Sequence, residues 1–371
     1  MVDVSLFVPS LRGGGAERAM VTLANGFADR GLKVDLVLAR AEGPYLSEVS
    51  SNVRVVDLRS RRVLASLPGL VRYLRKVRPE AMLSALNHAN VIAIMACLLS
   101  RITTRLVVSE HSNLSMSSSK PQNWRARIVL PLMRMSYRKA GGVVAVSRGV
   151  ADDLAKTIDL PRDRISVVYN PVVTPELIEK SGMPLSHPWL GEGRPPVILG
   201  VGRLTRAKDF ATLISAFARV HAQRECRLVI LGEGELRGEL EQLVTSLGIE
   251  GSVQLPGFAE NPFAWMGCVR LFVLSSRWEG LPTVLIEAMA CGTAVVSTNC
   301  RSGPDEILEG GKWGRLVPVG DVEALAGAIA VTLDTPQERL PDVRQRAEDF
   351  AQELAVDGYL KVLGLLPGHC G

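Results

Sequence analysis

Short, near-continuous apolar runs constrain the fold of this chain more than any other feature of its sequence. Glycine, proline or polar residues bound each run, and amphipathic segments separate one run from the next. A strand that is apolar on both faces needs helices on both faces of its sheet, which is typical of parallel sheets. The sequence therefore predicts an α/β protein with parallel sheets. The predicted strands are Val2–Pro9, Lys33–Ala39, Leu106–Ser109, Gly142–Val146, Val197–Val201, Arg227–Leu231, Leu271–Leu274 and Ala294–Thr298.

The alternation lapses between Asn170 and Pro196, where prolines cluster. A chain of 371 residues is long enough for two domains, and a proline-rich stretch is typical of the connection between them. We predict an N-terminal domain at 1–171, a linker at 172–196 and a C-terminal domain at 197–357. A last helix at about 358–371 is expected to pack back on the first domain.

The segment Glu279–Glu287 carries two carboxylates eight positions apart, joined by a glycine turn that enters an apolar helix. A helix N-terminus offers unpaired N–H groups and therefore favours anions. The first acid precedes this terminus and the second lies about two turns inside the helix, so each can contact a different part of one ligand. A phosphorylated sugar carrier fits this pattern. The alternative is a surface loop with two solvated acids.

A second segment, Val197–Phe210, has the pattern of a buried strand, a glycine turn and a helix. Arg203 follows the carboxyl end of the strand, and Lys208 lies five residues later near the helix start. Ligands of open parallel sheets bind at that edge. Arginine offers a planar fork and lysine a compact charge, so the pair is suited to a diphosphate and to the charge it gains on leaving. A solvated helix start is the alternative.

Together, Gly202-Arg203, Lys208, Glu279 and Glu287 resemble the donor site of glycosyltransferase family 4, whose members have the GT-B fold. Three further segments resemble this family and occur in its order along nearly the whole chain. They are the strand and glycine loop of Leu6–Arg18, the strand and histidine of Leu106–Asn113, and the glycine loop of Thr298–Ile307.

The resemblance implies two Rossmann-like domains that face each other across a cleft, with the nucleotide-sugar donor on the C-terminal domain and the acceptor on the N-terminal domain. It also implies transfer with retention of anomeric configuration. The implied catalytic residues are His111, Arg203, Lys208 and Glu279. Further implied donor-binding residues are Gly14, Gly15, Gly202, Gly232, Phe258, Gly280, Leu281, Pro282, Thr283 and Glu287. Glu17, Glu110 and Asn113 are the implied acceptor-binding residues.

Within the family, Gly-Gly-x-Glu-Arg, Ser-Glu-His-Ser-Asn and Glu-Gly-Leu-Pro-Thr-Val-Leu-Ile-Glu are found together in a narrower group. Its members extend polyprenyl-diphosphate-linked oligosaccharides and include N-acetylgalactosaminyltransferases of bacterial N-glycan assembly. Exopolysaccharide and lipopolysaccharide transferases share much of the pattern. The resemblance thus implies a UDP-HexNAc or UDP-hexose donor and a polyprenyl-diphosphate-linked acceptor. Another GT-B nucleotide-sugar enzyme, such as an epimerase or hydrolase, and a non-catalytic nucleotide-sugar-binding subunit are the alternatives.

The charge is divided unevenly along the chain. Residues 1–180 hold 26 Lys and Arg against 15 Asp and Glu, whereas the remainder holds 17 against 23. A basic first half predicts an anionic partner. With 5% aromatic residues and no RNA-binding signature or cysteine-histidine finger, nucleic acid is not expected. The basic amphipathic segments Arg59–Arg78 and Trp124–Lys139 favour an anionic membrane surface instead. For each segment, the alternative is a core-packed helix with a solvated basic face.

Metal or cofactor chemistry has little support in the sequence. No Asp-x-Asp occurs and the five histidines lack ligand spacing, so Arg203, Lys208 and backbone N–H groups are expected to neutralise the leaving diphosphate. Val91–Leu99 is shorter than the ~20 residues of a membrane span and is predicted to be a buried helix. The acidic residue Asp3 argues against a secretory signal, and the six cysteines show no C-x-x-C spacing. We expect a cytoplasmic protein, peripheral on the inner face of the cytoplasmic membrane.

Overall fold

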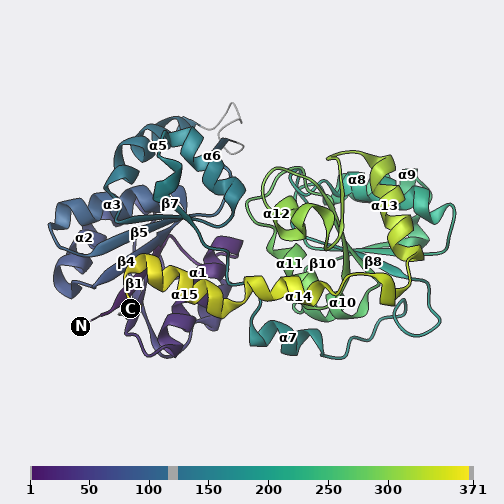
Figure 1. Cartoon of the computed structure of the whole chain (residues 1–371), viewed down its shortest axis with the longest axis horizontal. Helices are drawn as coiled ribbons and strands as arrows, with labels where there is room; N and C mark the ends of the chain where they lie inside the picture. The colour runs from purple at the N-terminus through teal and green to yellow at the C-terminus, as the bar shows by residue number, and fades with distance from the viewer. Residues whose placement is uncertain (1, 116–123, 367–371) are drawn as a thin grey trace. The chain divides into compact units, whose positions relative to one another are not determined.

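A computed structural model of the chain describes residues 2–115 and 124–366, and within the helix that begins at Trp124 it describes side chains from residue 129 onward. The chain forms two compact units (Figure 1). Unit 1 consists of residues 1–171 together with 352–371, and unit 2 of residues 172–351. The stretch 172–196, which the sequence predicts to be a linker, groups with unit 2 and includes helix α7 (Pro175–Ser181).

Unit 1 contains a seven-stranded sheet in the order β3-β2-β1-β4-β5-β6-β7, and every pairing in it is parallel. Four of its strands were predicted from the sequence; β3, β4 and β7 were not. The strands are β1 (Val4–Val8), β2 (Val34–Leu38), β3 (Val53–Asp57), β4 (Ala81–Ala85), β5 (Arg105–Glu110), β6 (Gly142–Ala145) and β7 (Ile165–Val167).

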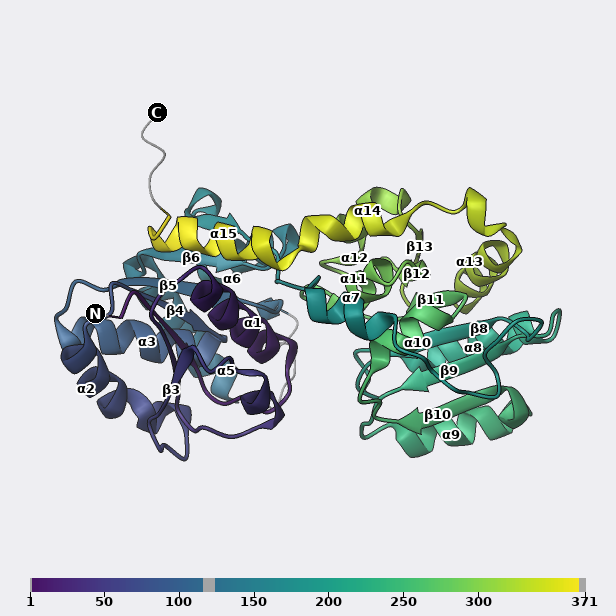
Figure 2. The same ribbon diagram turned by 90° about the horizontal axis from the view of Figure 1, so that it is seen from below.

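Helices flank this sheet, as its two-sided apolar strands require (Figures 1 and 2). The C-terminal helix α15 packs against α1, while α2 packs against α3. The predicted buried helix at Val91–Leu99 is present as most of α3, although Leu98 and Leu99 are half exposed. These helices are α1 (Gly15–Asp29), α2 (Leu67–Val77), α3 (Asn87–Ser100), α5 (Trp124–Ser136), α6 (Arg148–Ile158) and α15 (Gln352–Leu363).

Unit 2 repeats the architecture with a six-stranded parallel sheet in the order β10-β9-β8-β11-β12-β13. Its strands are β8 (Val197–Val201), β9 (Arg227–Leu231), β10 (Val253–Gly257), β11 (Leu271–Leu274), β12 (Ala294–Thr298) and β13 (Arg315–Val317). Besides α7, its helices are α8 (Phe210–His221), α9 (Arg237–Ser246), α10 (Pro262–Cys268), α11 (Thr283–Ala290), α12 (Pro304–Leu308), α13 (Val322–Asp334) and α14 (Val343–Ala347).

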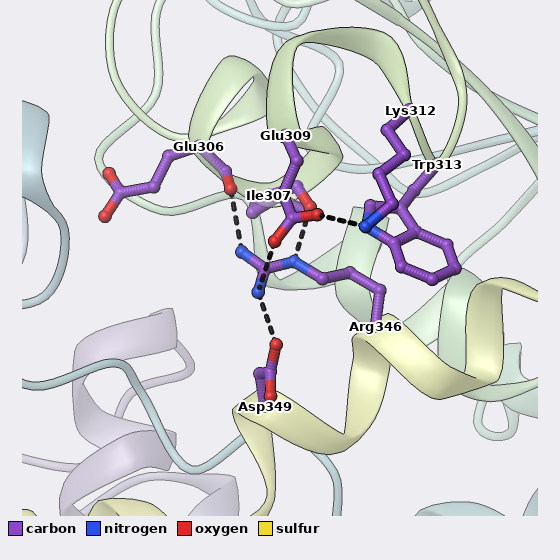
Figure 3. Close-up of polar contacts among 7 residues, drawn as sticks. All are labelled: Glu306, Ile307, Glu309, Lys312, Trp313, Arg346 and Asp349. Carbon is purple, nitrogen blue, oxygen red and sulfur yellow. Dashed lines mark hydrogen bonds and ion pairs between the residues drawn. The ribbon is translucent and has the colours of Figure 1, made fainter.

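A buried arginine joins α14 to α12 (Figure 3). Arg346 Nε donates to the carbonyl oxygen of Ile307 at 2.9 Å, and its Nη2 donates to that of Glu306 at 2.8 Å. Asp349 and Glu309 supply the counter-charge, and Glu309 also accepts from Trp313 Nε1 at 2.7 Å. Because the carbonyls of the last helical turn lack partners within a helix, the guanidinium caps α12 and fixes this short helix.

Among the helices of the described residues, none combines the length and the apolar character that a membrane span needs.

Candidate active site

The strand order of unit 2 reverses direction between β8 and β11. The chain proceeds outward from β8 to β9 and β10 on one side, and from β11 to β12 and β13 on the other. Ligands of doubly wound sheets bind beyond the carboxyl ends of the strands at such a switch point. Residues 202–209 follow β8 and residues 275–282 follow β11, so the two segments with the predicted diphosphate and sugar contacts both begin there.

Lys208 and Glu279 form an ion pair at this edge, with 2.6 Å between Lys208 Nζ and Glu279 Oε1. Ser276 Oγ donates to the same carboxylate oxygen, also at 2.6 Å. The side chains of Lys208 and Glu279 are 20% and 14% exposed. Since both charges are largely shielded from water, the pair holds each side chain in one orientation before any ligand arrives.

Backbone and side-chain contacts hold the loop that bears Lys208 against the loop after β11. Ser275 Oγ donates to the carbonyl oxygen of Lys208, and the backbone N–H of Arg277 donates to that of Ala207, both at 2.8 Å. Arg277 Nε donates to the Asp209 carboxylate at 2.9 Å. Asp209 has a left-handed backbone (φ 49°) and directly precedes α8. These contacts fix the position from which the Lys208 side chain projects.

Arg203 differs from Lys208 in its surroundings. Its side chain is exposed, and no ion pair or side-chain hydrogen bond joins it to another residue in the described parts of the chain. The backbone beside it is tightly packed, because a Cβ at Gly232 would lie 2.0 Å from the carbonyl oxygen of Gly202. With φ at 135°, position 232 is accessible only to glycine in practice. The loops after β8 and β9 therefore meet backbone to backbone next to the exposed Arg203 side chain.

The turn Gly280-Leu281-Pro282 leads into α11, which begins at Thr283. Glu287 is the fifth residue of this helix, so it lies about one turn inside it and not two turns as the sequence suggested. Its side chain is buried at 6% exposure. The predicted glycine loop of Thr298–Ile307 packs on this turn: a Cβ at Gly303 would lie 2.3 Å from Pro282 Cδ.

Phe258 directly follows β10 and is 79% exposed. The carboxyl end of β10 lies on the same edge of the sheet as those of β8 and β9, since these strands run parallel. An exposed aromatic ring at a strand end offers a flat apolar face on which a nucleotide base can stack.

In unit 1, His111 directly follows β5 at the carboxyl edge of the sheet. Its Nε2 lies 3.1 Å from Ser109 Oγ, while its Nδ1 is buried without a hydrogen-bond partner among the described residues. Desolvation lowers the pKa of His111 to about 4. The ring is therefore neutral near pH 7, and a neutral imidazole has one donor and one acceptor nitrogen.

Glu110 lies inside unit 1 and differs from the acceptor contact expected from the sequence. It is 1% exposed, and its Oε1 accepts hydrogen bonds from Tyr137 Oη and from Asn90 Nδ2, the latter at 3.0 Å. Burial raises the pKa of Glu110 to about 7. The inward direction follows from strand geometry, because successive side chains of β5 alternate between the faces of a sheet that is covered on both sides. Asn113 is also buried, at 4% exposure.

The glycine loop after β1 lies at the same carboxyl edge of unit 1. Gly14 precedes the first residue of α1, and Glu17 stands in the first helical turn. The Glu17 carboxylate folds back on the loop, since a Cβ at Gly14 would lie 2.1 Å from Glu17 Oε2. A side chain at position 14 would displace Glu17 from the helix N-terminus, which explains the glycine there.

The described residues contain no group of three or more His, Cys, Asp and Glu side chains placed to hold a metal ion.

Comparisons with known proteins identify the family of the chain. The family model "Glycosyl transferases group 1" matches residues 195–335, and the model "Glycosyltransferase Family 4" matches residues 13–175. The chain is 30% identical over 376 residues to N-acetylgalactosamine-N,N'-diacetylbacillosaminyl-diphospho-undecaprenol 4-alpha-N-acetylgalactosaminyltransferase of Campylobacter jejuni, covering 98% of this chain and 100% of the relative. The chain belongs to glycosyltransferase family 4. This confirms the family expected from the sequence motifs.

Two further similarities extend the comparison. The lipopolysaccharide core biosynthesis glycosyltransferase LpsE of Rhizobium meliloti is 28% identical over 364 residues, which are 95% of this chain and 97% of LpsE. The crystal structure of Anabaena Alr3699/HepE in complex with UDP superposes with a TM-score of 0.78 at 22% identity, covering 98% of this chain and 100% of HepE. The glycosyltransferase therefore has the GT-B fold, with one Rossmann-like parallel sheet in each unit.

Proposed function

We propose that this glycosyltransferase moves a sugar from a UDP-HexNAc or UDP-hexose to a polyprenyl-diphosphate-linked saccharide in bacterial glycan, exopolysaccharide or lipopolysaccharide assembly. The observation that carries the donor half is the Lys208–Glu279 pair at the switch point of unit 2, together with Arg203 after β8, which has no side-chain partner among the described residues. The acceptor half is supported by the C. jejuni relative, whose name specifies an undecaprenol-diphosphate-linked acceptor.

For the donor, we assign the diphosphate to Arg203 and Lys208. Arg203 is free to bind phosphate oxygens with its fork, and Lys208 adds a positioned charge as negative charge develops on the leaving group. Glu279 accepts from sugar hydroxyls and the N-terminus of α11 faces the diphosphate. Glu287 binds the ribose, and the base stacks near Phe258 and Gly232.

The reaction breaks the bond between the anomeric carbon and the diphosphate oxygen and forms one to the acceptor hydroxyl oxygen on the same face of the sugar. The hydroxyl proton passes to the leaving phosphate oxygen, so atoms and charges balance without a covalent enzyme intermediate. Glu279 is assigned to the sugar hydroxyls and not to nucleophilic attack, and Lys208 and Ser276 hold its Oε1 in place. Catalysis then consists of positioning and electrostatic stabilisation, and it needs no metal ion.

Unit 1 supplies the groups for the sugar and the acceptor in this proposal. The neutral His111 ring donates a hydrogen bond to a sugar hydroxyl, and Glu17 and Asn113 lie at the loops we assign to the acceptor. Glu110 supports the end of β5 from within the unit through Tyr137 and Asn90.

A lipid-linked acceptor requires the enzyme to work at a membrane, and the α2–α3 surface of unit 1 is best suited to it. A groove of about 720 Å³ runs along this surface. Arg72, Lys76 and Arg78 are exposed and form no ion pair with another described residue. Leu64, Leu98 and Leu99 expose 70%, 51% and 51% of their surface nearby. The groove is lined by Leu67, Pro68, Val71, Arg72, Arg75, Lys76 and Leu99.

The other basic segment, Trp124–Lys139, is less suited to this task. Arg134 donates through Nη2 to the carbonyl oxygen of Thr157 at 2.9 Å, and Arg138 pairs with Asp159 at 3.1 Å. The side chains of Arg125 and Arg127 lie outside the described residues. Cations already engaged with the protein are less available to anionic lipid, which favours the α2–α3 surface.

One experiment separates this function from its rivals. The purified enzyme is incubated with a panel of radiolabelled nucleotide-sugars, with and without a bacterial lipid extract. We expect label in the organic phase only when lipid is present. Conversion or hydrolysis of the nucleotide-sugar without lipid would indicate an epimerase or hydrolase, and binding without turnover in either arm would indicate a non-catalytic subunit.

A further inference from the structure

Three polar groups form a continuous hydrogen-bonded chain in unit 1. The Tyr359 hydroxyl lies 2.8 Å from Ser109 Oγ, which lies 3.1 Å from His111 Nε2. Tyr359 belongs to the C-terminal helix α15, whereas Ser109 lies near the end of β5 and His111 directly follows that strand. Tyr359 and Ser109 are 250 positions apart in the sequence. Tyr359 and Ser109 are both 0% exposed, so water does not compete for either hydroxyl.

The need of each buried hydroxyl for a hydrogen-bond acceptor fixes the direction in which the three groups donate. The structure offers the Tyr359 hydroxyl no acceptor other than Ser109 Oγ among the described residues, so a buried phenol proton must be donated to it. The Ser109 proton is then directed to His111 Nε2, which accepts. In a neutral imidazole whose Nε2 accepts, the proton resides on Nδ1.

We propose that Tyr359 and Ser109 are positioning residues that hold His111 as the Nδ1–H tautomer, with that N–H kept for an oxygen of the bound ligand. The proposal rests on the role of His111 given above and adds a specific atom and proton to it. The buried Nδ1 has no partner in the described protein, and an unpaired donor of this kind is costly unless a ligand satisfies it. A sugar hydroxyl or another neutral oxygen acceptor has the required chemistry.

The packing of α15 supports this role. Tyr359 lies in the core of unit 1 with Val107, Val144 and its helix neighbours Ala355 and Leu360. Its ring therefore has little freedom to move, and the hydroxyl is presented to β5 from a fixed direction. The C-terminal helix thus contributes to the candidate active site itself and not only to the apolar core.

Nitrogen NMR of the full-length protein labelled with 15N-histidine tests the tautomer directly. The His111 signals are assigned by their loss in His111→Gln. For the wild-type protein, we expect Nδ1 to give the shift of a protonated nitrogen and Nε2 that of an unprotonated one. In Tyr359→Phe and in Ser109→Ala, we expect the two shifts to move toward averaged values, because either tautomer then becomes accessible.

The matched control is Tyr73→Phe, which removes a hydroxyl bonded to Asp35 in the same unit and leaves the His111 chain intact. Thermal unfolding of each variant shows whether it is folded. The proposal would be overturned if wild-type His111 carried its proton on Nε2. It would also be overturned if Tyr359→Phe and Ser109→Ala both folded and left the His111 nitrogen shifts unchanged.

Turnover is measured separately, so that failure of the tautomer proposal can be distinguished from failure of the proposed role of His111 in the reaction. We expect Tyr359→Phe to lower kcat roughly tenfold with little change in the donor KM, since it disturbs orientation more than binding. If the tautomer shifts as expected while kcat is unchanged, the hydrogen-bonded chain stands and the proposed role of His111 in the reaction is wrong.

Discussion

Lys208 Nζ lies 2.6 Å from Glu279 Oε1, although 71 positions separate the two residues in the sequence. The parallel sheet explains the encounter, because β8 and β11 are adjacent and the residues follow their carboxyl ends. A lysine assigned to phosphate and a glutamate assigned to sugar are thus coupled before the donor binds. Donor binding must redistribute the lysine charge between the carboxylate and the diphosphate.

This coupling predicts non-additive mutational effects. Lys208→Ala should lower kcat about 100- to 1000-fold, the usual effect of losing one preorganised charge contact. Glu279→Gln should also lower it, but the double variant should be less impaired than the product of the single effects, by about 1–3 kcal/mol. Steady-state kinetics at saturating donor measures all three, and Arg206→Lys, at an exposed position in the same loop, serves as a charge-preserving control. Strict additivity would show that the pair does not act as a unit.

Arg203 offers a cleaner test of the diphosphate assignment. Its side chain is exposed and unpaired within the described protein, so Arg203→Ala should leave thermal stability unchanged within about 0.5 kcal/mol. Turnover should nevertheless fall about 100-fold. Arg206→Ala, an exposed arginine in the same loop, is the matched control and should retain activity. Near wild-type turnover of Arg203→Ala at saturating donor contradicts the assignment.

Much of this architecture could be predicted from the sequence, and the exceptions have a physical cause. All eight predicted strands are present, because each is largely buried on both faces and has a near-continuous apolar run. The sequence did not predict β3, β7, β10 and β13, because each is an edge strand whose exposed residues break the apolar run. The central strand β4 is fully buried but has the sequence AMLSA, which lacks the β-branched residues typical of strands and is rich in alanine, a residue depleted in strands.

The residues of the candidate site could be predicted from the sequence only where they belong to short contiguous motifs. Arg203, Lys208 and Glu279 follow apolar strands and could be placed at a sheet edge by pattern alone. Tyr359 carried no such signal, because its meeting with Ser109 depends on a helix that returns to unit 1 from the far end of the chain. The hydrogen bonds that hold Glu110 inside unit 1 were likewise not predicted, since their partners Tyr137 and Asn90 lie 27 and 20 positions away in the sequence.

Metal independence is expected because Arg203 and Lys208 can neutralise the leaving diphosphate. Activity should survive dialysis against EDTA and should not rise when Mg²⁺ or Mn²⁺ is returned. The control is the same assay with a metal-dependent transferase in parallel. Complete loss of activity that a divalent ion specifically restores would show that the leaving group depends on a metal.

The buried Glu110 predicts a pH dependence of stability. Burial holds its folded-state pKa at about 7, above the ~4.3 of an unfolded glutamate. The folded state then binds more protons between these values, so the free energy of unfolding should fall as pH rises through this range, by up to about 3 kcal/mol. Glu110→Gln should remove that part of the slope, whereas Glu80→Gln, an exposed change in the same unit, should not. Urea unfolding at pH 5 and pH 8 measures the change in the free energy of unfolding. An equal change for wild type and Glu110→Gln would contradict the prediction.

The α2–α3 surface predicts which cations hold the enzyme at a membrane. Wild-type protein should float with liposomes that contain anionic lipid, bind neutral liposomes weakly, and dissociate as salt is added. Arg72→Glu with Lys76→Glu should weaken binding by about 2 kcal/mol or more, roughly 30-fold, because each cation near an anionic surface contributes about 1 kcal/mol.

The matched variant, Arg134→Glu with Arg138→Glu, makes the same change of charge on the other basic segment and should bind almost as the wild type does. Thermal unfolding must first show that both variants are folded, since Arg134 and Arg138 contact Thr157 and Asp159. Equal losses in both variants would indicate diffuse attraction by the basic unit 1 as a whole. Release by the Arg134 and Arg138 variant alone would place the contact on the segment Trp124–Lys139. The membrane proposal itself fails if the wild-type protein shows no preference for anionic liposomes and uses a water-soluble acceptor as readily as a lipid-linked one. That result would leave the family assignment unaffected.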